Sequence, residues 1–508
     1  GIFNAVLVPQ IVRTMKEDDA QERLNRLITL AIGLLLGITL IMAAATPLLT
    51  QLYVRGDHQM MALTNAFTLW CMPQVFFYGL YTVLGQILAA KNHFGAYAWS
   101  STGANVISCA GFTTFVILFG KASEEPSAFW TEDKIALTAG CWTLGVAFQA
   151  LILFLPLTRL GFRYHPRFGL SGFGLKAMGP VALGSLGVVI AGEISSIVLT
   201  NITTLAPQRA RETTGASLLD IAGNATYQNA FTLYILPYSL IAVSISTALF
   251  PKISKAVADH NLTEARNDLN AALSNVGLLI TFFAAALVAF PEPIIRALLP
   301  SISMKEIMLI APVLVGLSIS LPVGSASLLL QRTFYAFEDG LRPFLSALVQ
   351  HGLVCVLLIS IVFTSTPNHW VTASAWVVSL ANVIALPVMA WMLRQRFHDH
   401  LGGRSVIATY AKALIAGVAA WGAVQLIKQP VMSLMPMDAP GVMGWFTALG
   451  ICVVFTVLMA VVYLAMLAVL RVNELHTAAI ALRRRLPIPM DRMSTMQPSS
   501  HHTKPEQE

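Results

Sequence analysis

Long apolar segments recur along the whole chain, separated by short linkers that carry most of the charges and turn-forming residues. Most of these segments reach or exceed the roughly 20 apolar residues that a helix needs to cross a bilayer. Segments of this length and composition predict membrane-spanning helices rather than strands. In chain order they are 1–12, 27–50, 62–90, 96–119, 136–158, 175–202, 217–250, 270–299, 305–336, 343–364, 370–393, 406–427 and 441–470.

The composition agrees with this prediction. The chain has 508 residues, of which 56% are hydrophobic and 11% are charged, whereas a soluble protein carries roughly 25% charged residues. We therefore predict an all-α polytopic membrane protein with about thirteen transmembrane helices. A soluble enzyme, a nucleic-acid-binding protein and a secreted disulfide-rich protein are excluded. The five cysteines lie in apolar segments without a CxxC pair, as expected for small buried side chains rather than metal ligands.

The distribution of basic residues predicts the orientation of the chain. If the segments alternate across the membrane, 24 of the 32 Lys and Arg residues fall on one side, which the positive-inside rule assigns to the cytoplasm. The C-terminus is then cytoplasmic, with Arg483–Arg485 against anionic lipid headgroups. We expect two linkers, 16–26 and 256–270, to form amphipathic surface helices, and the tail after about residue 486 to be disordered.

Parts of the sequence recur at an offset of 242 to 244 residues. Pro9–Arg13 recurs as Pro251–Lys255, and Gly33–Leu36 recurs as Gly277–Ile280. Prolines then follow at matching places: Pro47 and Pro291 or Pro293 near a helix end, and Pro73 and Pro322 within the next helix. Chance similarity among Leu-rich segments remains an alternative. An even number of segments separates the copies, so they predict a parallel repeat, which is common in secondary transporters.

The repeat suggests a division into four parts. Residues 1–170 form an N-lobe, residues 171–395 a C-lobe, residues 396–470 two extra helices, and residues 471–508 a basic, disordered cytoplasmic tail. The chain opens with Gly1, inside an apolar segment too short to cross a membrane. We therefore expect that one helix of the N-lobe is missing.

Glu193 is the most informative polar residue of the apolar segments. It lies well inside a predicted span, with Ser196 and Thr200 on the same helix face. An acid at the bilayer centre costs about 2.5–3.5 kcal/mol on insertion scales and normally faces protein or water. Glu193 is therefore our candidate for binding a proton or monovalent cation. The alternative is a hydrogen bond between helices near the outer interface.

Other polar residues of the apolar segments suggest a hydrated interior. For each amide taken alone, a hydrogen bond that holds two helices together is the competing interpretation, and for His351 it is a hydrogen-bonded core histidine. Our candidates for residues that line a cavity or bind substrate are Asn4, Gln74, Tyr78, Asn105, Glu193, Ser196, Asn224, Gln228 and His351. Asp220 and Tyr227 share a predicted face with two of them.

The sequence contains none of the catalytic motifs that would indicate an enzyme. It has no Gly-rich phosphate loop, HExxH or GxSxG motif. We therefore expect no enzyme activity and no cofactor. Transport would have to use a proton or cation gradient or the membrane potential, which is worth about 2.3 kcal/mol per charge per 100 mV.

The sequence contains three distinctive stretches, Phe3–Pro9, Leu84–Phe94 and Leu330–Pro343, of which the last is the most specific. They resemble stretches of the MviN/MurJ family of lipid II flippases. The resemblance extends to about residue 470. It implies the fourteen-helix fold of the multidrug/oligosaccharidyl-lipid/polysaccharide exporter superfamily, with two six-helix lobes and two further helices. It also implies movement of lipid-linked peptidoglycan precursor from the inner to the outer leaflet of the bacterial plasma membrane.

This sequence departs from the family at charged positions. The motif with a cavity arginine in the family's first helix, and a second arginine before its second helix, have no counterpart here. Thr232 and Ile235 stand where the eighth helix usually carries Arg and Glu upstream of Pro237. Some members couple to sodium through acids of the seventh and eleventh helices, and only Glu193 is available here.

The leading hypothesis from the sequence is a lipid II flippase that works by alternating access. Its partners would be lipid II, anionic lipids at the basic tail and cell-wall synthesis proteins, with no nucleic acid. Two alternatives remain: a polysaccharide or multidrug exporter of the same superfamily, or a membrane scaffold for cell-wall enzymes that transports nothing.

Overall fold

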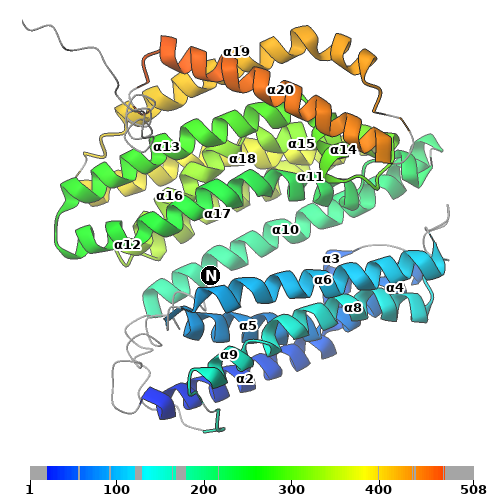
Figure 1. The fold of residues 1–508 in the computed structure, drawn as a ribbon, viewed down its shortest axis with the longest axis vertical. Helices are drawn as coiled ribbons and strands as arrows, with labels where there is room; N and C mark the ends of the chain where they lie inside the picture. The colour runs from blue at the N-terminus through cyan, green and yellow to red at the C-terminus, as the bar shows by residue number, and fades with distance from the viewer. Residues whose placement is uncertain are drawn as a thin grey trace, which may run out of the picture.

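The computed structural model describes residues 20–54, 58–90, 93–120, 129–162, 164–167, 179–215, 217–398, 400–437, 439, 442–472 and 474. Within these ranges the chain folds into helices and turns without a β-strand. Figure 1 shows that the helices form two bundles and a C-terminal pair, all with roughly parallel axes. The predicted all-α class is confirmed.

The N-terminal bundle is built around one small apolar core. Leu84, Ile87 and Leu88 are completely buried in it, together with Ile28 and Leu157. Its helices are α2 (Ala20–Ala44), α3 (Thr46–Tyr53), α4 (His58–Cys71), α5 (Pro73–Ala90), α6 (Phe94–Phe119), α8 (Glu132–Leu151) and α9 (Phe154–Arg159). Helices α6 and α8 approach closely because Gly145 faces the Ala104 carbonyl, where a Cβ would lie only 2.8 Å from the oxygen.

The C-terminal bundle has a larger core, with α13 on the side that faces α19 (Figure 1). Its helices are α10 (Gly179–Thr214), α11 (Asn224–Pro237), α12 (Ser244–Ala258), α13 (Leu262–Ala289), α14 (Pro291–Leu298), α15 (Met304–Ser318), α16 (Leu321–Ala336), α17 (Leu341–Thr364) and α18 (Trp370–Arg394), with the short helices η1 (Leu218–Asp220), η2 (Tyr238–Val243), η3 (Pro367–His369) and η4 (Gln395–Phe397). Gly184 of α10 lies so close to the Gly340 carbonyl that a Cβ there would be 2.2 Å from the oxygen. This position therefore requires glycine.

The C-terminal pair consists of α19 (Arg404–Leu434) and α20 (Val442–Val469), which pack on α13 and α14. Phe455 and Met459 of α20 are completely buried in this contact. The Tyr463 hydroxyl donates a hydrogen bond to the Leu278 carbonyl at 2.7 Å. Lys428 of α19 forms a 3.0 Å ion pair with Glu292 of α14, and both side chains are about four-fifths buried. Polar contacts thus hold the pair to the bundle.

The helices are long and apolar enough for twelve membrane spans within the described residues. Eleven are single spans, and α15 and α16 form a twelfth that bends by 46°. These twelve correspond one to one with the predicted segments from 27–50 to 441–470. The first predicted segment, 1–12, lies outside the described residues, so the count of thirteen remains compatible but not established.

Three details of the sequence prediction were wrong. The described part of the linker 16–26, residues 20–26, is the beginning of α2 and not a separate surface helix. Residues 256–270 do not form a separate surface helix, because α12 ends at Ala258 and α13 begins at Leu262 and continues to Ala289. Asn261 caps α13 by accepting a hydrogen bond from the Glu264 amide. The predicted segment 217–250 becomes α-helical only at Asn224, because η1 and a turn precede it.

Prolines divide the long helices at the places that the repeat predicts. Pro47 and Pro291 each lie in the first turn of a second half-helix, α3 and α14. Pro73 begins α5, and Pro322 lies in the first turn of α16. Proline is favoured in a first turn because the amide it lacks has no partner there. Each pair of half-helices can therefore change direction inside the membrane.

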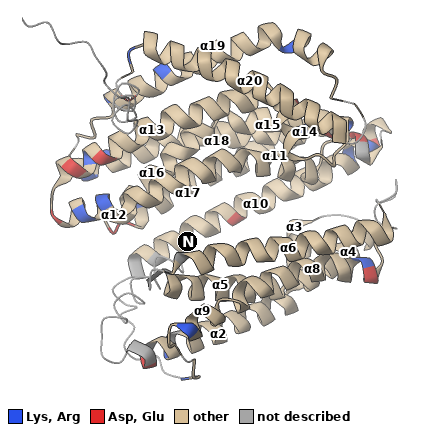
Figure 2. Cartoon of the chain, in the orientation of Figure 1, with Lys and Arg blue, Asp and Glu red and all other residues tan. Residues whose placement is uncertain are grey.

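Charged residues gather at the two ends of the bundles and leave an uncharged band between them (Figure 2). This is the distribution that a bilayer requires, because the insertion cost of a charge is greatest at the membrane centre. Helix α10 departs from it, with an acid well inside the helix, Glu193. Within the described spans, Glu193 is the carboxylate farthest from a helix end.

An ion cluster closes one end of the C-terminal bundle. Asp339, in the turn between α16 and α17, is buried and accepts hydrogen bonds from Arg396 at 2.7 Å and Arg342 at 3.2 Å. Burial alone raises the pKa of the Asp339 carboxyl, but hydrogen bonds from Arg396 and the Arg342 amide, with both positive charges, hold it below its ordinary 3.8. The cluster therefore stabilises the fold fully above the ordinary pKa of the carboxyl. This stabilisation is lost as the pH falls through the lowered pKa of Asp339.

Candidate functional site

Among the described residues, three side-chain hydrogen bonds join the two bundles. The Tyr53 hydroxyl at the end of α3 donates to Glu193 Oε2 of α10 at 3.0 Å. Asn201 Nδ2, also on α10, donates to the Leu52 carbonyl at 2.7 Å. Further along α10, Gln208 Nε2 contacts the Met60 sulfur at 3.4 Å. The contacts extend along one part of α10, from Glu193 towards its C-terminal end.

The break at Pro47 explains how α3 reaches α10. Helix α2 ends at Ala44, and α3 continues as a separate short helix whose last residue is Tyr53. A long, amphipathic tyrosine at this end can hydrogen-bond across to the other bundle. Glu193 remains exposed in spite of this contact. An exposed carboxylate within a span and at a boundary between bundles can bind a proton or a cation without a large rearrangement.

A second polar feature is a pocket of about 300 Å³ inside the C-terminal bundle. Helices α10, α11, α16, α17 and α18 contribute to its wall, together with η2. Its polar lining residues are Tyr234, Tyr238, Ser327, Gln331, Gln350, His351 and Asn382. Gln350 Nε2 donates to Asn382 Oδ1 at 2.7 Å, which connects α17 to α18 beside the pocket.

The backbone next to this pocket is irregular. Helix α11 ends at Pro237, and η2 continues the chain as a π-helix that begins at Tyr238. Segments of π-helix are rare and occur often at functional sites. The irregular segment brings Tyr238 into the wall of the pocket. The pocket therefore combines polar side chains with a local departure from α-helix.

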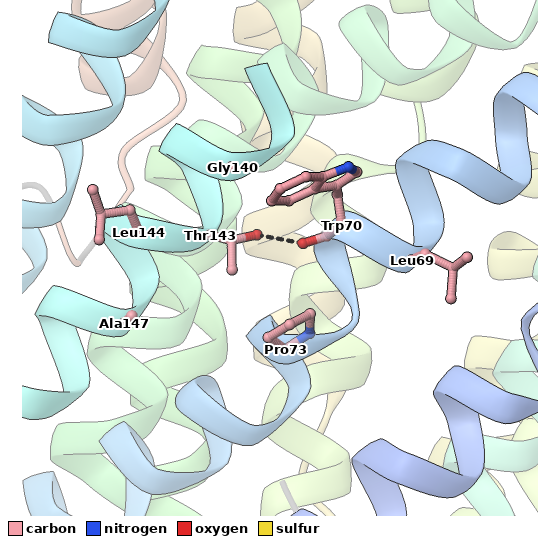
Figure 3. A pocket seen from close by; sticks show the side chains of 7 residues that line it. All are labelled: Leu69, Trp70, Pro73, Gly140, Thr143, Leu144 and Ala147. Atoms are coloured by element: carbon pink, nitrogen blue, oxygen red, sulfur yellow. Dashed lines mark hydrogen bonds between the residues drawn. The ribbon is translucent and has the colours of Figure 1, made fainter. Parts of the chain in front are cut away.

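The third feature is an apolar pocket of about 440 Å³ at the break between α4 and α5 (Figure 3). Leu69, Trp70 and Pro73 line it on one side, and Gly140, Thr143, Leu144 and Ala147 of α8 line it on the other. Thr143 donates a hydrogen bond to the Trp70 carbonyl at 2.8 Å and accepts one from Gln74 Nε2 at 2.9 Å. These bonds satisfy polar groups at the helix break, and the apolar wall offers no charged ligand group.

The structure does not bring the residues singled out from the sequence into one site. Gln74 is buried in the packing contact with Thr143, and the Asn224 side chain accepts a hydrogen bond from Thr203 at 3.1 Å. Tyr78, Asn105 and Gln228 are exposed, and Ser196 is half-buried. Asn4 lies outside the described residues.

Glu193 and His351 remain as the two candidates with informative surroundings. Glu193 lies at the contact between the bundles, and His351 lines the polar pocket, where its Nδ1 is 2.8 Å from Ser195 Oγ. Asp220, which we predicted on a face with Asn224, instead pairs with Lys305 at a helix end.

Sequence reasoning missed the partners of these two residues. Tyr53 is 140 positions from Glu193, and Ser195 is 156 positions from His351. No spacing signal joins residues so far apart. Tyr234 and Tyr238 lie on either side of Pro237, so this proline was the sequence feature that could have indicated the pocket. No group of three or more His, Cys, Asp or Glu side chains that could hold a metal ion occurs among the residues described.

The fold is that of a polytopic α-helical membrane protein. It resembles a solved lipid II flippase MurJ in an inward closed conformation, with a TM-score of 0.61 and 18% identity over 92% of this chain and 91% of that one. An inward-facing multidrug transporter of the MATE family matches with a TM-score of 0.60 and 15% identity, over 80% of this chain and 88% of the other. At these identities, the likeness establishes the shared fold.

The sequence comparisons identify the family within this class. The family model "Lipid II flippase MurJ" matches residues 1–440, and the chain belongs to this family. A probable lipid II flippase MurJ from Rhizobium meliloti is 24% identical over 91% of this chain and 82% of its own length. Another from Buchnera aphidicola is 26% identical over 59% of this chain, and the match covers 54% of the relative's length.

Proposed function

We propose that this protein moves lipid II, the lipid-linked peptidoglycan precursor, from the cytoplasmic to the outer leaflet of the bacterial plasma membrane. Membership of the MurJ family supports this cargo. The single structural observation that carries the mechanism is the contact of α10 with α3, because two bundles joined by a few polar contacts can separate there. The protein then acts as a transporter rather than as an enzyme.

The proposed mechanism is alternating access between residues 1–170 and 171–395. The diphosphate-sugar head group of lipid II would enter between the bundles while its isoprenoid tail stays in the bilayer. The C-terminal pair, α19 and α20, would offer a surface for the tail. The family resemblance implies Arg and Glu at the positions of Thr232 and Ile235, so we infer that head-group binding in this chain uses other residues.

Glu193 is the proposed coupling residue. Its carboxylate lies inside a span, it is exposed, and it bonds across the boundary through Tyr53. Binding of a proton or monovalent cation would change the charge at the contact that must open. Movement of that charge through the membrane potential is worth about 2.3 kcal/mol per 100 mV.

The proposed orientation places the C-terminus in the cytoplasm, which puts the Glu193–Gln208 part of α10 in the outer half of the membrane. It predicts opposite reactivities for Asp259→Cys, in the turn between α12 and α13, and Ser301→Cys, in the turn after α14. In intact cells, with the native cysteines replaced, an impermeant thiol reagent should label position 301 and not position 259. Labelling of position 259 alone would overturn the orientation and the binding of anionic lipid by the basic tail.

The function is tested with purified protein in vesicles that contain lipid II labelled on its head group. We expect the protein to make inner-leaflet lipid II accessible to a head-group-modifying enzyme added outside, because the polar head crosses a bilayer only slowly without help. Vesicles with labelled phospholipid and with a lipid-linked polysaccharide precursor serve as controls. Movement of the polysaccharide precursor alone would favour the exporter alternative. Movement of neither lipid II nor the polysaccharide precursor would favour the scaffold.

A further inference from the structure

His351 occupies an unusual position for an ionisable residue. It lies near the middle of α17, in a predicted membrane span, and it lines the polar pocket of the C-terminal bundle. The residues that line this pocket include no carboxylate. The pocket's volume of about 300 Å³ is too small for a disaccharide-peptide head group. The pocket therefore suits water and a small ion better than the proposed cargo.

The hydrogen bonds of Ser195 determine which nitrogen of the neutral His351 ring carries the free lone pair. Ser195 Oγ lies 2.8 Å from the Gly192 carbonyl, which can only accept, so the hydroxyl proton is used there. Oγ is also 2.8 Å from His351 Nδ1 and must then accept a hydrogen bond from it. In the neutral imidazole, Nδ1 consequently carries the proton and Nε2 carries the free lone pair.

Nε2 belongs to a ring that lines the pocket, and it lies beside a glycine of α10. The ring lies against α10 at Gly192, where an added Cβ would be 3.7 Å from Nε2, so the absence of a side chain leaves room beside this nitrogen. The Gln350 amide next to His351 is occupied by Asn382, and the Gln331 amide donates to the Tyr335 hydroxyl. Hydroxyl groups of Tyr234, Tyr238 and Ser327, as well as water, can solvate an imidazolium in the pocket.

We propose that His351 is a proton-binding site inside the C-terminal bundle, and that protonation of Nε2 controls the packing of α10 against α17. The regulatory part rests on the proposed flippase function. The hydrogen bond from Nδ1 to Ser195 Oγ is kept in both the neutral and the charged ring, because protonation of Nε2 leaves the Nδ1 proton in place. The charged ring requires more water around it, so protonation favours a more open pocket. Because Ser195 and Glu193 lie on the same helix, a shift of α10 changes the contact between the bundles.

Other titratable groups on the packed helices do not substitute for His351. Glu193 bonds to the other bundle, and the phenols ordinarily titrate near pH 10. Besides His351, the ionisable groups on these elements are Glu193, Arg209, Arg211 and Glu212 on α10, Tyr227, Tyr234 and Tyr238 on α11 and η2, Arg332 and Tyr335 on α16, Arg342 and Cys355 on α17, and Arg394 on α18. Arg332 lies over the Phe250 ring at 6.0 Å, and Arg342 pairs with Asp339.

The first test measures protonation directly, without transport. In full-length protein labelled with ¹⁵N-histidine in lipid nanodiscs, one imidazole signal that titrates between about pH 5 and 8 should vanish in His351→Asn. Asparagine can still donate to Ser195 but cannot bind a proton. The control is His369→Gln, since His369 is an exposed histidine outside the pocket. If every titrating imidazole signal remains in His351→Asn, His351 is not a proton-binding site, whether or not the protein transports lipid II.

The second test measures the pH dependence of lipid II transport in vesicles. The wild-type rate should change at least about fivefold between about pH 5.5 and 8, and His351→Asn should flatten this profile. Ser195→Ala keeps the imidazole and should shift the midpoint of the pH profile rather than remove the pH dependence. This variant also tests the proposal if His351→Asn folds poorly. An unchanged profile in both variants would overturn the regulatory role. Absence of wild-type transport would instead refute the proposed function, while the nuclear magnetic resonance titration would still decide the proton site.

Discussion

A covalent link between positions 52 and 201 should stop lipid II transport. Asn201 donates to the Leu52 carbonyl at 2.7 Å, so cysteines at these positions would lie close enough for a short bifunctional reagent that joins two thiols through disulfide bonds. Alternating access requires α3 and α10 to separate. We expect cross-linked Leu52→Cys/Asn201→Cys protein, in a background without the five native cysteines, to lose at least about 99% of its rate, a barrier increase of ~2.7 kcal/mol. A reducing agent that cleaves the link should restore the rate.

The matched control is a cross-link that joins helices without joining the bundles. Glu292 of α14 and Lys428 of α19 form a 3.0 Å ion pair, and both belong to the unit that contains α13. A link between Glu292→Cys and Lys428→Cys should leave most transport intact, because neither helix has to move relative to the other. If the 52–201 link forms fully and transport continues, α3 and α10 do not separate during the cycle, and the proposed mechanism is wrong.

The sequence predicted the spans well because membrane insertion depends on local composition. Each predicted segment from 27–50 onwards corresponds to a span, and the prolines at 47, 73, 291 and 322 mark helix breaks. The helix ends were less predictable. Helix α10 continues past residue 202 to Thr214, and α13 begins at Leu262, because a helix continues into polar sequence outside the bilayer as long as its backbone bonds are satisfied.

The candidate site was only partly predictable for a different reason. In a soluble helix, the apolar face points to the core, but lipid is as apolar as a protein core, so this signal is lost in a membrane. The sequence therefore could not show that Gln74 faces Thr143 of α8. It did single out Glu193 and His351, because ionisable residues are rare in spans. Their partners, Tyr53 and Ser195, depend on tertiary contacts between distant helices.

Replacement of Glu193 by glutamine should impair transport while the protein remains folded. Glutamine keeps the size of the side chain and can still accept the hydrogen bond from Tyr53, but it cannot bind a proton or neutralise a cation. If Glu193 is the coupling residue, we expect the lipid II transport rate to fall about tenfold, equivalent to ~1.4 kcal/mol of barrier. The residual rate should no longer respond to an imposed proton or sodium gradient in vesicles.

Two further variants separate the charge of Glu193 from its hydrogen bond. Tyr53→Phe removes the donor but keeps the carboxylate, so it should weaken the contact between the bundles without removing the response to the ion gradient. Glu212→Gln changes an exposed acid at the end of the same helix, where it pairs with Arg209, and should have little effect because exposed ion pairs contribute at most about 1 kcal/mol. If Glu193→Gln transports at the wild-type rate with an unchanged gradient response, the carboxylate does not couple transport to an ion. Its contact with Tyr53 would then be structural, since an amide accepts that hydrogen bond equally well.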